Sequence, residues 1–303
     1  MQLFTSALPT TVRGSFVAIG NFDGVHRGHQ AMVERLLGLA RRHDRPAIVV
    51  TFDPHPLALL RSGGAPPGLT TVPERVELLR KAGVDDVVVL ATSPELLQLT
   101  AERFFEQVVQ QELHAAGLVE GPNFCFGKDR GDNITILRHL CQAHGVSLDV
   151  IDPVTWKGQW VSSSAIRSLL IAGDLDSAVD LLGHPYRLTG LVTRGAERGR
   201  TLGVPTANLA EIATVLPGFG VYAGKATVSG HCFPTAVNIG PNPTFGEGAT
   251  KIEAHIIDFT GDLYDQALSI DLTTRLRDIR KFSAIDELKQ QLADDIAAAR
   301  SAS

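Results

Sequence analysis

Short apolar runs alternate with helical patterns along the first half of the chain, and this alternation restricts the possible folds more than any other feature. The runs are rich in β-branched residues, whereas the segments between them repeat apolar residues every three or four positions. Short buried strands that alternate with helices are typical of βαβ units, which build a parallel sheet covered by helices on both faces. The predicted strands are Phe16–Ile19, Ala47–Phe52, Val87–Leu90 and Val146–Ile151, and the predicted helices are Met32–Ala40, Pro73–Lys81, Ala101–Leu113 and Ile134–Ala143.

The pattern changes near Gly183, after which strands follow one another without helices between them. Their connections are rich in Gly and Pro, and such a series favours a small closed barrel. Ser229 and Gly230 separate two of the strands and predict a hairpin turn. We therefore predict an α/β domain at residues 1–183 and a β-barrel domain at residues 184–303. The predicted barrel strands are Leu188–Val192, Val221–Val228, Thr235–Ile239, Ile252–Phe259 and Leu268–Thr273.

The last predicted element is an amphipathic helix that follows the barrel strands. Ser283 and Asp286 have the spacing of a capping box at its start, with Asp in place of the usual Glu or Gln. One face of this helix is apolar, so we expect it to close the barrel. That face consists of Ile285, Leu288, Leu292 and Ile296.

The bulk composition limits the classes of protein that the sequence can represent. With 44% hydrophobic and 20% charged residues among 303, the chain has the composition of an ordinary folded protein. A net charge of −5 argues against general binding of nucleic acid by a basic surface. The three cysteines lack the spacings of a disulfide framework or a zinc site, and no run suits a membrane helix. Because no secretion signal is visible either, we expect a cytoplasmic protein without membrane or nucleic-acid partners.

One segment of the first predicted domain concentrates residues that suit the binding of a phosphate. The sequence GNFDGVHRGH, residues 20–29, follows the first predicted strand and opens a helix. Such a turn directs backbone N–H groups and the positive end of a helix dipole at one point. His26 and His29 are three residues apart at the helix start, so their side chains project to the same side.

Three interpretations of this histidine pair compete. An arbitrary pair at a helix start is most often solvated. A metal site that also uses Asp23 lacks a convincing further ligand, since zinc sites usually have three or four protein ligands. In the third interpretation the imidazoles stabilise charge on a phosphate, and Gly24 and Gly28 allow the backbone to approach it closely.

Three more motifs follow in order along the chain and favour the phosphate interpretation. With GNFDGVHRGH they resemble the adenylyltransferase module of the bifunctional riboflavin kinase/FAD synthetase family. Ser164 stands where that family has Thr, and Ala165 stands where an Arg is often found. The three motifs are FDPHP at residues 52–56, NFCFG at residues 123–127 and SSSAIR at residues 162–167.

The resemblance implies a Rossmann-like HxGH nucleotidyltransferase domain in which His26 and His29 hold the phosphates of ATP. It places Asn123 at the flavin and metal end of the site. The other residues that it implies for ATP and phosphate binding are Gly20, Asn21, Phe22, Asp23, Gly24 and Gly28 of the first motif, and Ser162, Ser163, Ser164 and Arg167 of the last.

The residue types of these motifs suit adenylyl transfer. The nucleophile of that reaction is already an anionic phosphate, so no general base is required. The enzyme has to align this phosphate with the α-phosphorus of ATP and neutralise charge with N–H groups, imidazoles, Arg and Mg²⁺. The first motif supplies donors and contains no obvious base.

A second set of motifs lies in the predicted barrel. The stretch RGAERGRTLGVPTANL, residues 194–209, joins a glycine-rich loop to PTAN, although a glycine-rich loop alone would indicate only a surface turn. With VYAG, NIGPNPTFG and KIEAHIIDF it resembles the riboflavin kinase domain of the same family. This resemblance implies that Thr206 and Asn208 bind Mg²⁺ and ATP phosphates and that Glu253 is the general base. It also implies phosphate binding by Gly195, Arg198, Gly199, Arg200 and Gly203.

A base is needed at this second site because the substrate is the neutral primary alcohol of riboflavin, whose proton has to leave as the oxygen attacks the γ-phosphorus. Strand alternation puts Glu253 and His255 on one face of KIEAHIID and Ala254 on the other. The alternation does not define which face lines a pocket. Ile279 stands where the family usually has Glu.

Together the resemblances predict a two-domain enzyme of flavin-cofactor synthesis. The barrel phosphorylates riboflavin to FMN, and the first domain adenylates FMN to FAD with release of pyrophosphate, with ATP and Mg²⁺ used in both steps. Two alternatives are a chain in which only the kinase half is active, and a flavin- or nucleotide-binding regulator without turnover. The sequence does not define the oligomeric state.

Overall fold

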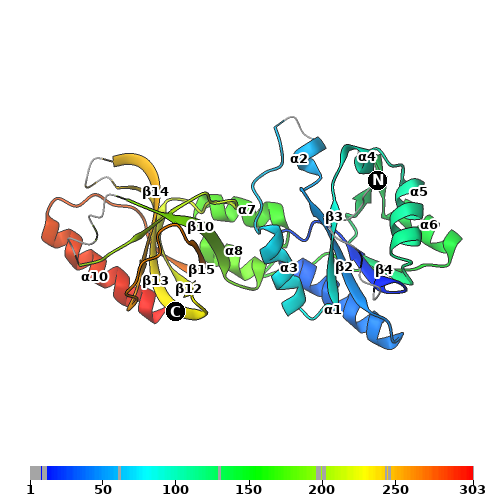
Figure 1. Ribbon diagram of the computed structural model, residues 1–303, viewed down its shortest axis with the longest axis horizontal. Helices are drawn as coiled ribbons and strands as arrows, with labels where there is room; N and C mark the ends of the chain where they lie inside the picture. The colour runs from blue at the N-terminus through cyan, green and yellow to red at the C-terminus, as the bar shows by residue number, and fades with distance from the viewer. Residues whose placement is uncertain are drawn as a thin grey trace. The chain divides into compact units, whose positions relative to one another are not determined.

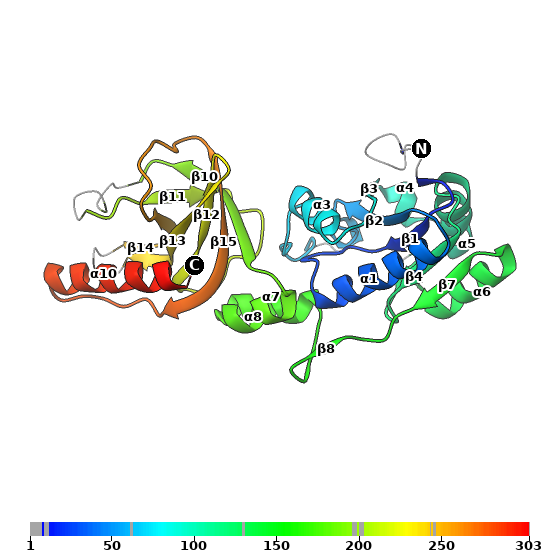
Figure 2. The ribbon, with the colours of Figure 1, turned by 90° about the horizontal axis from the view of Figure 1, so that it is seen from below.

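The computed structural model describes residue 8 and residues 12–60, 63–128, 131–195, 199, 203–242, 244 and 247–302. The chain divides into two compact units, Met1–Val161 and Ser162–Ser303 (Figures 1 and 2). Within the described ranges, no helix combines the length and apolar character needed to cross a bilayer.

The first unit is built on a five-stranded sheet in which every neighbouring pair is parallel. The strand order is β3-β2-β1-β4-β7, so β1 occupies the centre. This arrangement confirms the predicted α/β class and the four predicted strands. The strands are β1 (Phe16–Ile19), β2 (Ala47–Asp53), β3 (Asp86–Ala91), β4 (Gly117–Glu120) and β7 (Ser147–Val150).

Strand β4 was not among the predicted elements, although it pairs with both β1 and β7. Its sequence GLVE is only four residues long and begins with Gly, which has a low strand propensity. A side chain at Gly117 would overlap Phe16 and Ser147 on the neighbouring strands. Glycine is therefore required here by close packing of the sheet.

Helices cover both faces of this sheet (Figure 1), and alternation along β1 divides the core. Phe16 and Ala18 face the cluster that includes the helices α1 and α3, whereas Val17 and Ile19 face the cluster that includes α5, η2 and α6. The single helix predicted at 101–113 is α5 followed by a π-helix, η2. The helices are α1 (Arg27–Arg42), α2 (Leu57–Leu60), α3 (Val72–Lys81), α4 (Pro94–Leu97), α5 (Ala101–Phe104), η2 (Phe105–Glu112) and α6 (Ile134–His144). Two small hairpins complete the unit, β5 (Cys125–Phe126) with β6 (Asp132–Asn133) and β8 (Thr155–Trp156) with β9 (Gln159–Trp160).

The second unit contains a closed antiparallel barrel of six strands. This confirms the small closed barrel predicted from the sequence. Val228 pairs with His231 across the predicted hairpin, and Ser229 and Gly230 both have positive φ, at 49° and 80°. Such angles are those of a type I′ turn. Strand β11 was not predicted and lies at the end of the PTAN motif. Around the barrel the strands are β10 (Tyr186–Thr193), β11 (Ala207–Ala210), β14 (Glu247–Ile256), β13 (His231–Asn242), β12 (Gly220–Val228) and β15 (Ala267–Arg277).

The C-terminal helix α10 (Ile285–Ser301) is present, but its first turn differs from the prediction. Ser283 contacts Glu287 rather than forming a capping box with Asp286, and Ile285 is 62% exposed. The helix is held instead by a buried charge: Asp295 accepts from Arg277 of β15 at 2.6 Å. Further contacts with the barrel come from Ile296 and Ala299, which pack near Ala223 and Ile257.

Two helices that precede the barrel in sequence belong to the second unit. These are α7 (Ser163–Ala172) and α8 (Leu175–Leu182). Helix α8 packs on β10 and β15, and the Thr274 hydroxyl of β15 donates to Asp176 at 2.6 Å. Helix α8 lies before the predicted barrel domain in the sequence but packs on the barrel. The domain boundary at residue 183 therefore stays a prediction.

We predict that the fragment 162–303 is more stable than the fragment 184–303. Removing α8 takes away Leu175, Leu181 and Leu182, which are all buried. Burial of a leucine side chain contributes about 1.5–3 kcal/mol, so loss of all three should lower the free energy of unfolding by roughly 4.5–9 kcal/mol. Urea unfolding followed by circular dichroism measures this difference. Equal midpoints for the two fragments would place the boundary of the autonomous domain at residue 183.

Candidate active sites

The segment GNFDGVHRGH connects the carboxyl end of β1 to the start of α1. In the sheet, β2 and β3 lie on one side of β1, whereas β4 and β7, which come later in the sequence, lie on the other. In open parallel sheets, ligands bind outside the carboxyl ends of the strands where the strand order reverses in this way. The segment therefore occupies the position in the first unit best suited to a ligand.

His26 and His29 form a stacked pair at the N-terminus of α1. His26 is the N-cap residue, and its Nδ1 accepts a hydrogen bond from the His29 backbone N–H at 3.4 Å. The two imidazole rings lie 3.7 Å apart between centroids with an interplanar angle of 13°. Burial, the neighbouring His26 and the Arg75 charge together hold the pKa of His29 well below its usual range. His29 is therefore neutral at pH 7 and offers one N–H as a donor.

The glycines of this loop allow the close packing that the histidine pair needs. A Cβ at Gly28 would lie 3.2 Å from the His26 ring, and Gly24 has φ of +84°, where other residues are strained. The Gly24 N–H donates to Thr70 Oγ1 at 3.1 Å, so this amide already has a partner within the protein.

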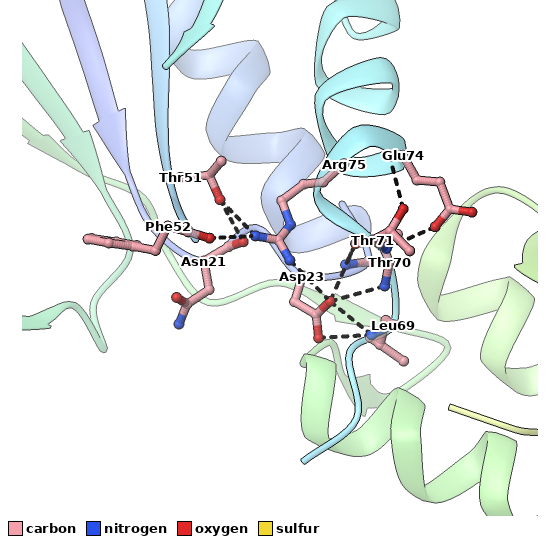
Figure 3. A network of polar contacts seen from close by, with 10 residues as sticks. Asn21, Asp23, Thr51, Phe52, Leu69, Thr70, Thr71, Glu74 and Arg75 are labelled. Atoms are coloured by element: carbon pink, nitrogen blue, oxygen red, sulfur yellow. Dashed lines mark hydrogen bonds and ion pairs between the residues drawn. The ribbon is translucent and has the colours of Figure 1, made fainter. Parts of the chain in front are cut away.

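Asp23 is directed into the protein, where it fixes the shape of the loop (Figure 3). Its side chain is 2% exposed, and its carboxylate accepts N–H donors from Leu69 at 2.9 Å and from Thr70 at 3.1 Å. Phe22 is also buried. Among the described residues, no cluster of three or more His, Cys, Asp or Glu side chains is arranged to hold a metal ion. The interpretation of the histidine pair and Asp23 as a metal site therefore gains no support.

Sequence reasoning missed Arg75, which lies on α3 and is 5% exposed. Its Nη1 donates to Thr51 Oγ1 at 3.0 Å and approaches the Phe52 carbonyl at 3.4 Å, and its Nη2 lies 3.8 Å from Asp23 (Figure 3). The Thr51 hydroxyl in turn donates to the Asn21 carbonyl at 3.0 Å. An Arg in a helical pattern normally indicates a solvated face, so only its contacts identify its role.

Unpartnered polar atoms collect in this part of the first unit. Within the described structure, six buried side-chain polar atoms have no hydrogen-bond partner, and three of them are Asn21 Oδ1, His29 Nδ1 and Arg75 Nε. A buried donor or acceptor without a partner costs about 1–3 kcal/mol, so such atoms are rare away from functional sites. Their clustering supports a ligand-binding role for this loop.

Glu120 is a second buried group at the carboxyl end of the sheet that the sequence did not indicate. It ends β4, is 1% exposed, and accepts the Ile19 N–H of β1 at 2.9 Å. Burial raises the pKa of the Glu120 carboxyl well above its usual range, and one backbone hydrogen bond opposes this only in part. Burial together with Glu120 raises the pKa of the Cys141 thiol to about 12, so this thiol is protonated and inert.

The remaining residues predicted for adenylyl transfer lie in two other places. Asn123 is exposed in the loop after β4, where the Phe124 N–H donates to the Gly121 carbonyl at 3.1 Å. Ser162 is the N-cap of α7 and accepts the Ala165 N–H at 3.2 Å. Ser163, Ser164 and Arg167 follow on α7 within the second unit. Whether the serine motif shares one ATP with the histidine pair therefore stays a proposal.

In the barrel, three residues occupy one row across neighbouring strands. Asn208 of β11 pairs with Glu253 of β14, and Glu253 pairs with Asn238 of β13 on its other side. Directly opposite residues share a face of the sheet with Cβ atoms about 4.5–5.5 Å apart. The structure therefore brings two predicted site residues together and adds Asn238, which sequence reasoning did not single out.

Burial along β14 identifies the face on which Glu253 lies. Ala254 and Ile256 are buried in the core, whereas Glu253 and His255 alternate with them and are partly exposed. His255 Nδ1 lies 2.8 Å from the Pro205 carbonyl, which ties β14 to the PTAN motif. The carboxylate thus lies on the accessible face, beside the segment expected to bind phosphate.

The glycines of the second loop pack against the side chains of PTAN. A Cβ at Gly195 would overlap the Asn208 carboxamide, and a Cβ at Gly199 would overlap the Val204 carbonyl and lie 3.4 Å from Thr206 Oγ1. Gly203 has φ of +80°. Arg198 and Arg200, which were also predicted to bind phosphate, lie outside the described residues.

Comparison with known proteins assigns each half of the chain to a family. A family model of FAD synthetases matches residues 8–165, and a family model of riboflavin kinases matches residues 182–303. The chain is 38% identical to a bifunctional riboflavin kinase/FMN adenylyltransferase of Pseudomonas fluorescens, over 95% of this chain and 93% of that protein. Proteins of the same description from Escherichia coli K12 and Bacillus subtilis 168 are 35% and 34% identical, over 95% and 93% of this chain and 92% and 90% of their own lengths.

A solved structure shares the fold of the whole chain. It is a crystal structure described as a macrolide-efflux protein from Streptococcus pneumoniae, with a TM-score of 0.85 and 30% identity over 99% of this chain and 97% of that chain. The two family models match the two halves in order, and the relatives extend across both halves. This chain therefore belongs to the bifunctional riboflavin kinase/FMN adenylyltransferase family.

Proposed function

We propose that the barrel unit phosphorylates riboflavin to FMN, and that the histidine loop of the first unit serves the adenylation of FMN to FAD. Each step uses one ATP, and the second releases pyrophosphate. The observation that carries the proposal is the pairing of two different sites in one chain: a stacked histidine pair at a helix N-terminus, and a carboxylate in register with Asn208. Because both steps consume ATP, we expect the protein to act in the cytoplasm.

At the first site the residues act as donors and not as bases. The phosphate of FMN is the nucleophile and already carries negative charge. His26 and His29 lie where the N–H groups of the α1 N-terminus converge, so they can hold the phosphates of ATP and stabilise charge that builds during transfer. The hydroxyls and N–H groups at the start of α7, with Arg167, are proposed to bind further phosphate oxygens.

At the second site Glu253 is proposed as the general base. It removes the proton of the ribityl hydroxyl as that oxygen attacks the γ-phosphorus of ATP. Asn208 beside it and Thr206 nearby supply oxygen donors, which Mg²⁺ prefers. Both side chains lie against glycines, and any larger residue there would fill the space beside the Asn208 carboxamide and the Thr206 hydroxyl. These residues therefore fit a magnesium–ATP complex. A bound Mg²⁺ would neutralise charge on the phosphates during transfer.

The two alternatives make different products. A chain with only the kinase active converts riboflavin and MgATP to FMN alone, and a regulator without turnover makes neither FMN nor FAD. A regulator has no use for a base, so the position of Glu253 on the accessible face favours an enzyme. Chromatographic separation of the flavins after incubation distinguishes the three cases, with FAD as the expected product.

We predict that His29→Ala removes FAD synthesis from FMN but leaves riboflavin phosphorylation intact. The variant loses one transition-state donor at the first site only, which typically costs about 10²–10³ in kcat. The two rates are measured separately with FMN and with riboflavin. His139→Ala is the matched control, since His139 is exposed on α6 in the same unit. A wild-type rate of FAD synthesis in His29→Ala would contradict the assigned role.

We predict that Glu253→Gln has the opposite effect. The amide keeps the size of the side chain but accepts no proton, so FMN production should fall by roughly 10²–10⁴. FAD synthesis from supplied FMN should continue at the normal rate. Glu211→Gln is the control, because Glu211 is an exposed glutamate just after β11. A parallel loss of both reactions in Glu253→Gln would show that this residue supports the fold and is not the base.

A further inference from the structure

Arg75 joins parts of the first unit that are far apart in the sequence. Its guanidinium reaches the end of β2 through Thr51 and Phe52, and it lies 3.8 Å from Asp23 in the loop after β1 (Figure 3). Thr51 continues the connection to the Asn21 carbonyl. The loop is thus tied at two points, Asn21 and Asp23, through one buried side chain of α3.

We propose that Arg75 is a positioning residue for FMN adenylation, which holds the loop from Gly20 to Gly24 in the form that presents the histidine pair. The inference rests on the proposed function of that pair. The Nη atoms of Arg75 contact Thr51, Phe52 and Asp23, so Arg75 acts through the loop. A displacement of about 1 Å at a reacting centre costs on the order of 10² in rate, which makes such support consequential.

Arginine suits this position better than lysine. The guanidinium is planar and carries five N–H donors in a fixed fork, so it contacts the Thr51 hydroxyl, the Phe52 carbonyl and the Asp23 carboxylate from one place. A lysine ammonium is a single point with three donors on a flexible stem. It keeps the charge but does not reproduce the whole set of contacts.

The charge of Arg75 also lowers the pKa of His29, so a change in this pKa is a second measurable effect of replacing Arg75. The charged or titratable groups around His29 are His26 on the same helix and Arg75 on α3, and Asp23 of the loop and Asp53 of β2 interact with Arg75. Burial of His29 lowers its pKa most, followed by His26 and then Arg75. Loss of the Arg75 charge therefore raises the pKa of His29, so the His29 ring becomes protonated at a higher pH on acidification.

The test compares Arg75→Met with Arg75→Lys in the full-length protein. In Arg75→Met, kcat/KM for FMN adenylation should fall roughly 10²-fold, and the acidic limb of its pH profile should move to higher pH. In Arg75→Lys the rate should also fall, but the limb should stay near its wild-type position because the charge remains. Riboflavin phosphorylation, measured in the same samples, should be unchanged in both.

Thr51→Val provides the matched control for charge. It removes the link between Arg75 and Asn21 without changing any charge, so it should lower the adenylation rate and leave the pH limb in place. A direct measurement is the NMR titration of the His29 ring, assigned by its absence in His29→Ala. That titration should move upward in Arg75→Met only. It reports on the site even where the variant has lost activity.

The possible results test the role of Arg75 separately from the function proposed for the histidine pair. Wild-type adenylation in Arg75→Met would overturn the positioning role of Arg75. An unmoved His29 titration in that variant, or equal pH limbs in Arg75→Met and Arg75→Lys, would overturn the role of its charge. Normal FAD synthesis in His29→Ala would instead overturn the function proposed for the histidine pair, whatever the Arg75 variants show. A fall in thermal stability of Arg75→Met without any fall in rate for Thr51→Val would reduce Arg75 to a structural residue.

Discussion

The carboxylate of Asp23 is 2% exposed, and a charge so far from water has to be paired or hydrogen-bonded to be tolerated. The backbone N–H groups of Leu69 and Thr70 meet this requirement, with Arg75 as the nearest cation. Satisfying one buried charge thus joins the loop after β1 to a segment more than forty residues later, as the sequence separations of 46 and 47 show. Helix α1 begins directly after this anchored turn, so the place where its N–H groups converge follows from the same interaction.

The barrel positions its candidate site residues by strand pairing and not through a buried carboxylate. Pairing of β11, β14 and β13 puts Asn208, Glu253 and Asn238 in one row, because directly opposite residues of antiparallel strands share a face. Strand register therefore fixes the lateral spacing of these side chains, whereas in the first unit a network of side chains fixes a loop. A one-residue slip of β14 would turn Glu253 to the core and bring Ala254 to the accessible face. The site thus depends on the register as strictly as the core does.

The sequence predicted the elements with strong periodicity and missed those defined by their neighbours. The strands β1, β2, β3 and β7 were recognisable from their short apolar runs, and the turn at Ser229–Gly230 was recognisable from its two residues. Strand β4 was not, because GLVE becomes a strand only between two partners, and Gly117 is needed only for their close approach. At α10 the helix itself was predicted and Ile296 packs on the barrel, but Ile285 is exposed, and the Arg277–Asp295 pair that fixes the helix has no local signature. The motifs likewise singled out His26, His29 and Glu253 as candidate site residues, whereas Arg75 and Asn238 are placed near them by partners far away in sequence.

The charge states at the first site suit a reaction between two anions. ATP and FMN both bring negative phosphates, so the site needs positive potential that does not vary with pH. A histidine would supply it only when protonated, and burial with a neighbouring imidazole and cation disfavours that form of His29. Arg75 keeps its proton at any physiological pH, even though burial lowers its pKa. The N–H donor of His29 thus belongs to a neutral ring, whereas the positive charge near it belongs to an arginine that keeps its proton and lies beside Asp23. The chemistry proposed for the barrel needs the reverse, since its nucleophile is a neutral alcohol and Glu253, the proposed base, has to accept a proton.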